Sequence, residues 1–120
     1  MTSKPLPFLT IVIPTYDEKE RLFNTVNSLS QQEYPTNLAE IIVIDDASPE
    51  PINEQSLILD ALPFKVKVFR NSINQGRARS RNTGIRHASG EIIIFLDSDM
   101  TVTPNFLSAH AEFHQKKVRL

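Results

Sequence analysis

Two aspartates separated by one residue, Asp97-Ser98-Asp99, follow a short apolar run of this 120-residue chain. Carboxylate oxygens suit hard cations such as Mg²⁺ or Mn²⁺, and protein Mg²⁺ sites often combine one or two carboxylates with substrate phosphates. The same aspartates could instead cap a helix or lie in a solvated turn. Because an Asp-x-Asp pair is a weak motif by itself, its interpretation depends on the elements around it.

A second acidic pair, Asp45-Asp46, follows another apolar run. Consecutive side chains of an extended chain point in opposite directions, so we expect only one of these carboxylates to face a ligand. A carboxylate in that place could accept hydrogen bonds from a base N–H or a ribose hydroxyl. A simple turn is the alternative, because Asp, Ser and Pro all favour turns.

Arginines crowd one stretch of predicted helix, at positions Arg77, Arg79, Arg81 and Arg86. Arg77 and Arg81 are one helical turn apart and share a face. The planar guanidinium suits phosphate, and the start of this helix at Gly76 offers backbone N–H groups to an anion. The alternative is a basic face that is merely solvated.

The aromatic and histidine residues give weaker signals. Tyr16 directly follows the first apolar run and could stack on a nucleobase, or it could pack against the next helix. His110 and His114 have a spacing that could bind zinc, but they lie beside apolar residues and lack the metalloprotease pattern. We expect these two histidines, and the lone His87, to be structural.

Four short apolar runs predict the strands that position these residues. They are residues 8–13, 40–44, 65–69 and 91–96. Three runs are continuous and rich in Ile and Val, which is typical of strands buried on both faces of a parallel sheet. The run 65–69 alternates instead and indicates an edge strand. No run approaches the roughly 18 residues of a membrane span, so no span is expected in this chain.

Helical patterns alternate with these strands. We expect a first helix that starts at a capping box of Asp17 and Glu20 and ends at Tyr34-Pro35. Further helices are predicted over 52–62 and 76–88, and from Thr103-Pro104 towards Val118. Strands that alternate with helices predict an α/β fold, an open and mostly parallel sheet with flanking helices of the Rossmann-like kind.

Each polar cluster follows the end of a predicted strand. The clusters are residues 14–18, 45–48, 70–76 and 97–99. In open α/β sheets, ligands bind at the carboxyl ends of the strands. The sequence therefore predicts one shared binding site at this edge.

Composition narrows the class of protein. The length predicts a single domain, and a formal net charge of −1 argues against nucleic-acid binding. The absence of cysteine excludes disulfides and fits a reducing compartment, and the N-terminus lacks the pattern of a signal peptide. We therefore expect a cytoplasmic location.

Four segments together resemble the family 2 glycosyltransferases, which have the GT-A fold. The matching segments are residues 10–18, 40–48, 74–85 and 90–99. Their order and spacing are more specific than any one of them. The resemblance implies a sugar-transferring enzyme that uses a nucleotide-diphosphate sugar, with UDP as the expected nucleotide.

The resemblance also implies roles for individual residues. Asp46 matches the aspartate that contacts the base, and Asp99 matches the aspartate that binds the metal, Mn²⁺ or Mg²⁺. Asp97 is expected near the ribose or the metal. The candidate nucleotide-binding residues are thus Pro14, Thr15, Tyr16, Glu18, Asp46, Gly76, Arg81 and Asp97, and the candidate metal ligands are Asp97 and Asp99.

The chain departs from the family pattern in two residues and in length. The family commonly has Asn in place of Asp17 and Gly in place of Ala47. Family members continue well beyond the Asp-x-Asp motif, so we expect the general base and the acceptor site to lie beyond Leu120. Residues 1–120 are then the donor-binding part of a catalytic domain, truncated at the C-terminus and inactive when isolated.

The reaction implied is metal-dependent, inverting transfer to a hydroxyl of a carbohydrate or lipid-linked acceptor. The missing part could bring the enzyme to the cytoplasmic face of a membrane. A non-catalytic nucleotide-binding module is the alternative function.

Overall fold

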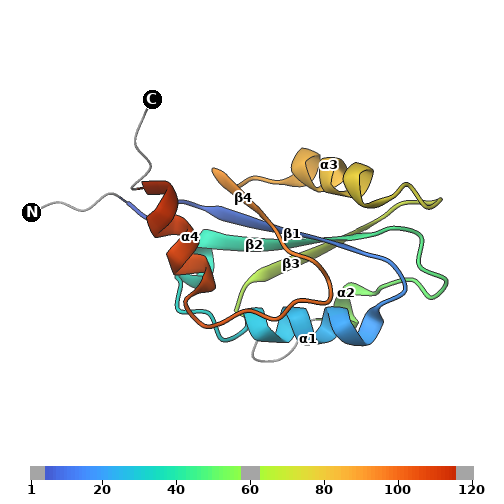
Figure 1. Ribbon diagram of the computed structural model, residues 1–120, viewed down its shortest axis with the longest axis horizontal. Helices are drawn as coiled ribbons and strands as arrows, with labels where there is room; N and C mark the ends of the chain where they lie inside the picture. Colours follow the sequence, from blue (N-terminus) through green and yellow to red (C-terminus); the bar gives the residue numbers. More distant parts are fainter. Residues whose placement is uncertain (1–4, 58–62, 116–120) are drawn as a thin grey trace, which may run out of the picture.

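The computed structural model describes residues 5–57 and 63–115. It contains one sheet of parallel strands in the order β3-β2-β1-β4 (Figure 1). The strands are β1 (Leu9–Thr15), β2 (Ala39–Asp45), β3 (Lys65–Arg70) and β4 (Ile92–Phe95). The helices are α1 (Lys19–Leu29), α2 (Glu54–Leu57), α3 (Arg77–His87), α4 (Phe106–Gln115) and a 3-10 helix at Thr36–Leu38. The predicted α/β class with an open parallel sheet is confirmed.

Helices cover both faces of the sheet. Helix α3 lies on one face, and α1 and α2 lie on the other (Figure 1). The larger apolar core includes Leu22 of α1, Leu57 of α2 and Leu107 of α4, and a smaller cluster on the α3 face contains Val12, Ile42 and Ile44. Strands β1 and β2 are buried along their whole length because they lie between these layers.

The two edge strands differ in how well the sequence predicts them. Strand β3 is an edge strand, as its alternating pattern indicates. Strand β4, which we predicted to be buried on both faces, is the other edge, and Phe95 is 43% exposed. That prediction was wrong because only Ile94 of the strand is buried. Within the described residues β4 pairs only with β1, and a run of isoleucines does not reveal whether a strand lies at the edge of its sheet.

The start of α1 differs from the predicted capping box. The helix begins at Lys19, and its N-cap residue is Glu18, whose side chain makes no capping hydrogen bond. Asp17 adopts a left-handed φ of 52° and donates its backbone N–H to Ser48 Oγ over 2.9 Å. The chain therefore enters α1 through a turn that a distant loop fixes, which local sequence patterns do not reveal.

The remaining helix boundaries follow the predictions in part. Helix α1 ends at Leu29, before the predicted stop at Tyr34-Pro35, and α3 matches its prediction closely. Helix α2 covers Glu54–Leu57, whereas predicted residues 58–62 and Val118 lie outside the described residues. None of the described helices has the length and apolar character needed to cross a membrane.

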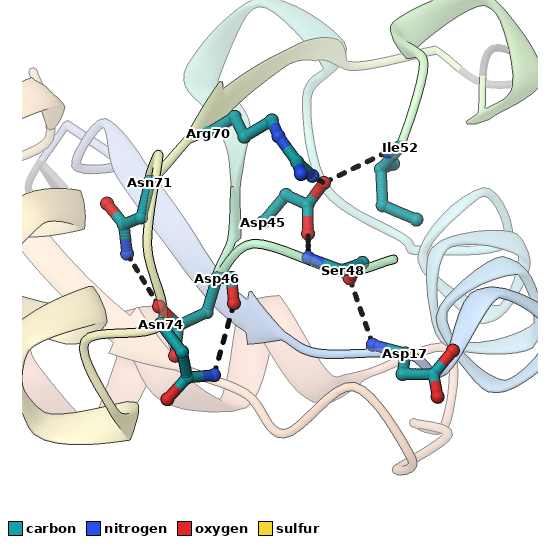
Figure 2. A network of polar contacts seen from close by, with 8 residues as sticks. All are labelled: Asp17, Asp45, Asp46, Ser48, Ile52, Arg70, Asn71 and Asn74. Carbon is teal, nitrogen blue, oxygen red and sulfur yellow. Dashed lines mark hydrogen bonds and ion pairs between the residues drawn. The ribbon is translucent and has the colours of Figure 1, made fainter. Parts of the chain in front are cut away.

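Asp45 closes the loop that follows β2 (Figure 2). Its side chain is fully buried, and it accepts hydrogen bonds from the backbone N–H groups of Ser48 and Ile52, both over 3.0 Å. Arg70 at the end of β3 donates to the same carboxylate over 2.8 Å. Asp45 thus ties its own loop to the neighbouring strand.

Packing on the other face of the sheet depends on Gly84. A Cβ atom added to Gly84 would lie 2.3 Å from Cγ1 of Val12. No larger residue fits there unless Val12 moves. Helix α3 can approach β1 this closely only because position 84 carries no side chain.

Replacing Asp45 with Asn should lower the free energy of unfolding by about 3 kcal/mol near neutral pH, because this fully buried side chain loses its charge and one of its two acceptor oxygens. Burial by itself favours the neutral acid, but the hydrogen bonds from Ser48, Ile52 and Arg70 outweigh it and lower the pKa of Asp45. A lowered pKa stabilises the fold above the unfolded-state pKa of about 4, and this contribution disappears as the pH falls through the folded-state pKa.

The gap in urea-unfolding free energy between parent and Asp45→Asn should therefore narrow below about pH 4. Glu50→Gln, which alters an exposed ion pair with Lys19, is the control and should change stability little. A gap for Asp45→Asn that is the same at about pH 7 and about pH 3 contradicts the assignment.

Gly84→Ala should lower the free energy of unfolding by about 1–3 kcal/mol, because the added methyl group overpacks the contact with Val12. Shrinking the partner should relieve this strain, so Gly84→Ala should cost less in a Val12→Ala background than in the parent. Urea unfolding of the parent, both single variants and the double variant measures the coupling. If the loss of unfolding free energy in the double variant equals the sum of the losses in the two single variants, this contact does not limit how closely α3 approaches β1.

Candidate functional site

A pocket of about 300 Å³ opens at the carboxyl edge of the sheet. Segments that follow all four strands contribute to its lining, as expected for an open parallel sheet. The lining residues are Pro14, Thr15, Tyr16, Glu18, Asp46, Asn74, Gly76, Arg77, Ser80 and Ser98. The predicted residues Asp97 and Asp99 flank Ser98 in the chain, and Arg81 approaches Asp97.

The loop after β1 presents two polar groups with different surroundings. Thr15 is 4% exposed, and its hydroxyl has no hydrogen-bond partner within the described residues. Buried hydroxyls nearly always have a partner, so this one is a group that a bound ligand could satisfy. Tyr16 is 47% exposed at the rim, where its ring is accessible for stacking.

Asp46 joins the loop after β2 to the segment between β3 and α3, and Figure 2 shows its contacts with Asn71 and Asn74. Its carboxylate accepts hydrogen bonds from Asn71 Nδ2 over 2.9 Å and from the backbone N–H groups of Gln75 and Gly76 over 2.7 and 2.9 Å. Burial and the neighbouring Asp45 favour the neutral acid, but these hydrogen bonds outweigh them and lower the pKa of Asp46. The residue is therefore a fixed negative charge at the pocket.

This arrangement corrects one expectation and supports another. The N–H of Gly76, which we expected to be open to an anion, is already bonded to Asp46. Asp46 lines the pocket whereas Asp45 turns away from it, as the alternation of side chains predicts. Between this pair and Ser48, Ala47 adopts a left-handed φ of 63°, a conformation in which a Cβ atom costs about 1–2 kcal/mol and which favours glycine.

Asp97 faces two arginines of α3. Its Oδ1 lies 3.8 Å from Arg77 Nη1 and 3.5 Å from Arg81 Nη2, so the two arginines do share a face. The Arg81 guanidinium also lies 5.6 Å from the ring centroid of Phe95, and its Nε is buried without a partner among the described residues. One acidic and two basic groups thus meet at the end of β4.

Ser98, between the two aspartates, is held by α1 and was not predicted as a site residue. Its hydroxyl donates to the Glu18 carboxylate, and its carbonyl oxygen accepts from Thr25 Oγ1 over 2.9 Å. Ser98 is 5% exposed and Thr25 is fully buried. Glu18 therefore contacts the Asp97–Asp99 loop as well as the pocket.

The same side of α1 also holds the chain beyond this loop. Ser28 Oγ accepts from the backbone N–H of Val102 over 3.2 Å. Just past the helix, the Gln32 side chain donates to the carbonyl oxygen of Thr103 over 2.6 Å and accepts from the N–H of Leu107 over 2.8 Å. Thr25, Ser28 and Gln32 recur at helical spacing, next to the buried apolar residues of α1. This spacing is visible in the sequence and could have predicted that α1 contacts another segment through polar side chains.

Asp97 and Asp99 are the candidate metal ligands. Asp99 is exposed and Asp97 is half-buried. Within residues 5–57 and 63–115, no group of three His, Asp or Glu side chains could hold a metal alone. Two carboxylates still suit a Mg²⁺ or Mn²⁺ ion that takes its other ligands from water and substrate phosphates.

The histidines lie away from the pocket lining. His110 and His114 are stacked with ring centroids 6.4 Å apart, and burial together with His114 lowers the pKa of His110. His87 stacks on Phe69 with centroids 3.7 Å apart. These ring contacts agree with a structural role for all three.

Comparisons with known proteins agree with the geometry. Glycosyltransferase AglE of Haloferax volcanii is 34% identical over 99 residues, which is 82% of this chain and 32% of AglE. TarS of S. aureus in complex with UDP-GlcNAc matches with a TM-score of 0.77 and 27% identity, over 90% of this chain and 31% of that chain. Mannosyltransferase PcManGT from Pyrobaculum calidifontis, in complex with GDP-Man and Mn²⁺, matches with a TM-score of 0.70 and 27% identity, over 81% of this chain and 29% of that chain.

The chain thus spans about a third of the length of these relatives. The family model described as "Glycosyl transferase family 2" matches residues 10–119, which is nearly the whole sequence. The sheet order, the polar edge and this match lead to one assignment: the chain belongs to glycosyl transferase family 2, and its sheet is that of the GT-A fold.

Proposed function

We propose that this chain binds the nucleotide-sugar donor of a metal-dependent, inverting glycosyltransferase, with a UDP-linked sugar as the donor. The observation that carries this proposal is the pocket to which the loops after all four strands contribute, in a chain of this family. Its TarS neighbour was solved with UDP-GlcNAc, and PcManGT with GDP-Man and Mn²⁺. These ligands support a nucleotide sugar as the ligand class.

The nucleoside is assigned to the side of the pocket formed by β1 and β2. The exposed ring of Tyr16 can stack on the base, and the unpartnered Thr15 hydroxyl can bond to a polar atom of the nucleoside. A carboxylate has about four lone-pair sites, and the protein uses three at Asp46. One acceptor site remains for a base N–H.

The diphosphate is assigned to the end of β4 and the start of α3. Asp97 and Asp99 would hold the divalent cation, which supplies charge neutralisation for the departing diphosphate when bound. Arg77 and Arg81 lie on the α3 side of Asp97 and can donate to phosphate oxygens. These arginines thus orient the phosphates and complement the negative charge that the pocket otherwise concentrates.

The reaction proposed is direct displacement at the anomeric carbon by a hydroxyl of a carbohydrate or lipid-linked acceptor. The bond to the diphosphate breaks as the new glycosidic bond forms, and a general base takes the hydroxyl proton. We assign donor binding to this chain and assign none of its residues as that base. The 120-residue chain alone should therefore bind a donor without transferring its sugar.

Asp99→Asn should weaken UDP binding about tenfold in the presence of Mn²⁺, because a neutral amide replaces a charged metal ligand. Without metal, the affinity of the variant for UDP should match that of the parent. Calorimetry with UDP, with and without Mn²⁺, measures both affinities. Because Asp99 is exposed, the melting temperature should change little.

Asp17→Asn is the matched control, since it makes the same chemical change at an exposed aspartate outside the pocket lining. Asn also tolerates the left-handed conformation found there, so the turn should persist. An equal response to Mn²⁺ in the parent and in Asp99→Asn removes the proposed metal role. If the folded parent does not bind UDP in the presence of Mn²⁺, the donor-binding proposal itself is wrong.

Ser98→Ala should weaken Mn²⁺-dependent UDP binding several-fold, because the loop that carries Asp97 and Asp99 loses its bond to Glu18. Glu18→Gln should have a similar effect, and the double variant should be no weaker than the weaker single variant. Ser30→Ala, which removes a hydroxyl bonded to the nearby Asn27 carbonyl, is the control and should leave binding unchanged. Additive losses in calorimetry would mean that Glu18 does not act through Ser98.

A further inference from the structure

The charges of this chain are separated along its sequence. Residues 61–90 contain seven Lys or Arg and no Asp or Glu, whereas residues 1–60 contain three Lys or Arg and ten Asp or Glu. The described part of this basic segment, residues 63–90, forms β3, α3 and the turns beside them. The formal net charge of the whole chain is only −1, but the positive charges are concentrated in one segment, which makes that part of the molecule basic.

A groove of about 480 Å³ lies within this region, between the end of β3 and one side of α3. Arg79, Thr83 and Arg86 of α3 recur at helical spacing along it, and Arg70 and Asn71 come from the end of β3. Among the residues that the structure describes, the lining contains no carboxylate. The groove is thus a concave surface with three guanidinium groups and several amide and hydroxyl groups.

Each guanidinium in the groove is held by a contact of its own. Arg70 donates to the buried Asp45 over 2.8 Å, and its side chain remains 39% exposed. Arg79 donates to Gln75 Oε1 over 3.2 Å, and Arg86 donates to Thr83 Oγ1 over 3.0 Å. Of these partners only Asp45 is charged. The positive charge of Arg79 and Arg86 is therefore not neutralised by the contacts that position them.

We propose that this groove is a second anion site, which binds a phosphate group through Arg70, Arg79 and Arg86. Three clustered guanidiniums suit a group that carries close to two negative charges and several acceptor oxygens, as phosphate does at neutral pH. A single carboxylate carries half that charge and fewer acceptors. The recognised chemistry is the phosphate itself, whether a lipid headgroup or a soluble ion carries it.

The groove is separate from the pocket assigned to the donor. The two linings share no residue, and they lie on different sides of α3, because Arg77 lines the donor pocket whereas Arg79 and Arg86 line the groove. Arg77 approaches Asp97, but neither Arg79 nor Arg86 has an ion pair among the described contacts. The arginines assigned to the second site are therefore distinct from those assigned to the donor site, although Asn71 and Gln75 of the groove lining also donate to Asp46 of the donor pocket.

The test is a titration of the 120-residue chain with inorganic phosphate, without divalent metal, followed by amide resonances in ¹H–¹⁵N NMR. The amides of Asn71, Asn82 and Thr83 should shift saturably. The double variant Arg79→Gln/Arg86→Gln should lose at least about tenfold in affinity, because charge-assisted hydrogen bonds are lost. Arg79→Lys/Arg86→Lys retains the charge and should lose less.

Lys19→Gln removes one positive charge from α1, on the other face of the sheet, and is the matched control that should bind as the parent does. Flotation with phosphatidylcholine vesicles, with and without phosphatidic acid, whose headgroup is a phosphate monoester, separates the two sources of phosphate. Vesicle binding that needs phosphatidic acid and is lost in the Arg79→Gln/Arg86→Gln variant supports a lipid headgroup. Phosphate-dependent shifts without vesicle binding support a soluble phosphate ligand.

Three results would overturn the proposal. One is the absence of groove shifts with phosphate together with the absence of vesicle binding. Another is an Arg79→Gln/Arg86→Gln variant, folded by its NMR spectrum, that binds as tightly as the parent. The third is an equal loss in the Lys19→Gln control, which would show only a response to overall charge.

Discussion

Two buried carboxylates at the end of β2 hold the edge of the sheet on which the candidate site lies. Asp45 binds its own loop and Arg70 of the next strand, and Asp46 binds the backbone at the start of α3. Backbone N–H groups in such loops need partners, because unpaired buried donors are costly. The side chains of the two adjacent aspartates point in opposite directions, and each accepts hydrogen bonds from backbone N–H groups. The position of α3, the turn at Ala47 and the shape of the pocket therefore all depend on this pair.

Much of this architecture was predictable because it depends on local patterns. Continuous Ile and Val runs identified β1 and β2, and the polar clusters after each strand predicted the edge at which the candidate site lies. What the sequence could not show was long-range: the turn at Asp17 is fixed by Ser48, and β4 is an edge because of its neighbours in space. Likewise, the buried Glu40 is held by Thr10 and the N–H of Ser89, which no local pattern reveals.

Helix α3 serves two regions of different character. Arg77 and Arg81 face Asp97 at the proposed diphosphate site, whereas Arg79 and Arg86 face a groove whose lining has no carboxylate. Helical spacing alone separates these pairs, because residues two apart in a helix point in different directions. The arginines that are close together in the sequence therefore lie on two different surfaces, and only one of these surfaces belongs to the proposed donor pocket.

The most direct test of the central claim is to locate bound Mn²⁺ by paramagnetic broadening of amide resonances in the 120-residue chain. The donor-site account predicts that UDP and Mn²⁺ together broaden the amides of Tyr16, Gly76 and Asp99 at low metal concentration, and that Mn²⁺ without UDP does so far less. Two results would contradict a metal-dependent nucleotide site at this edge. One is equal broadening with and without UDP, and the other is broadening that is strongest near exposed carboxylates such as Glu50.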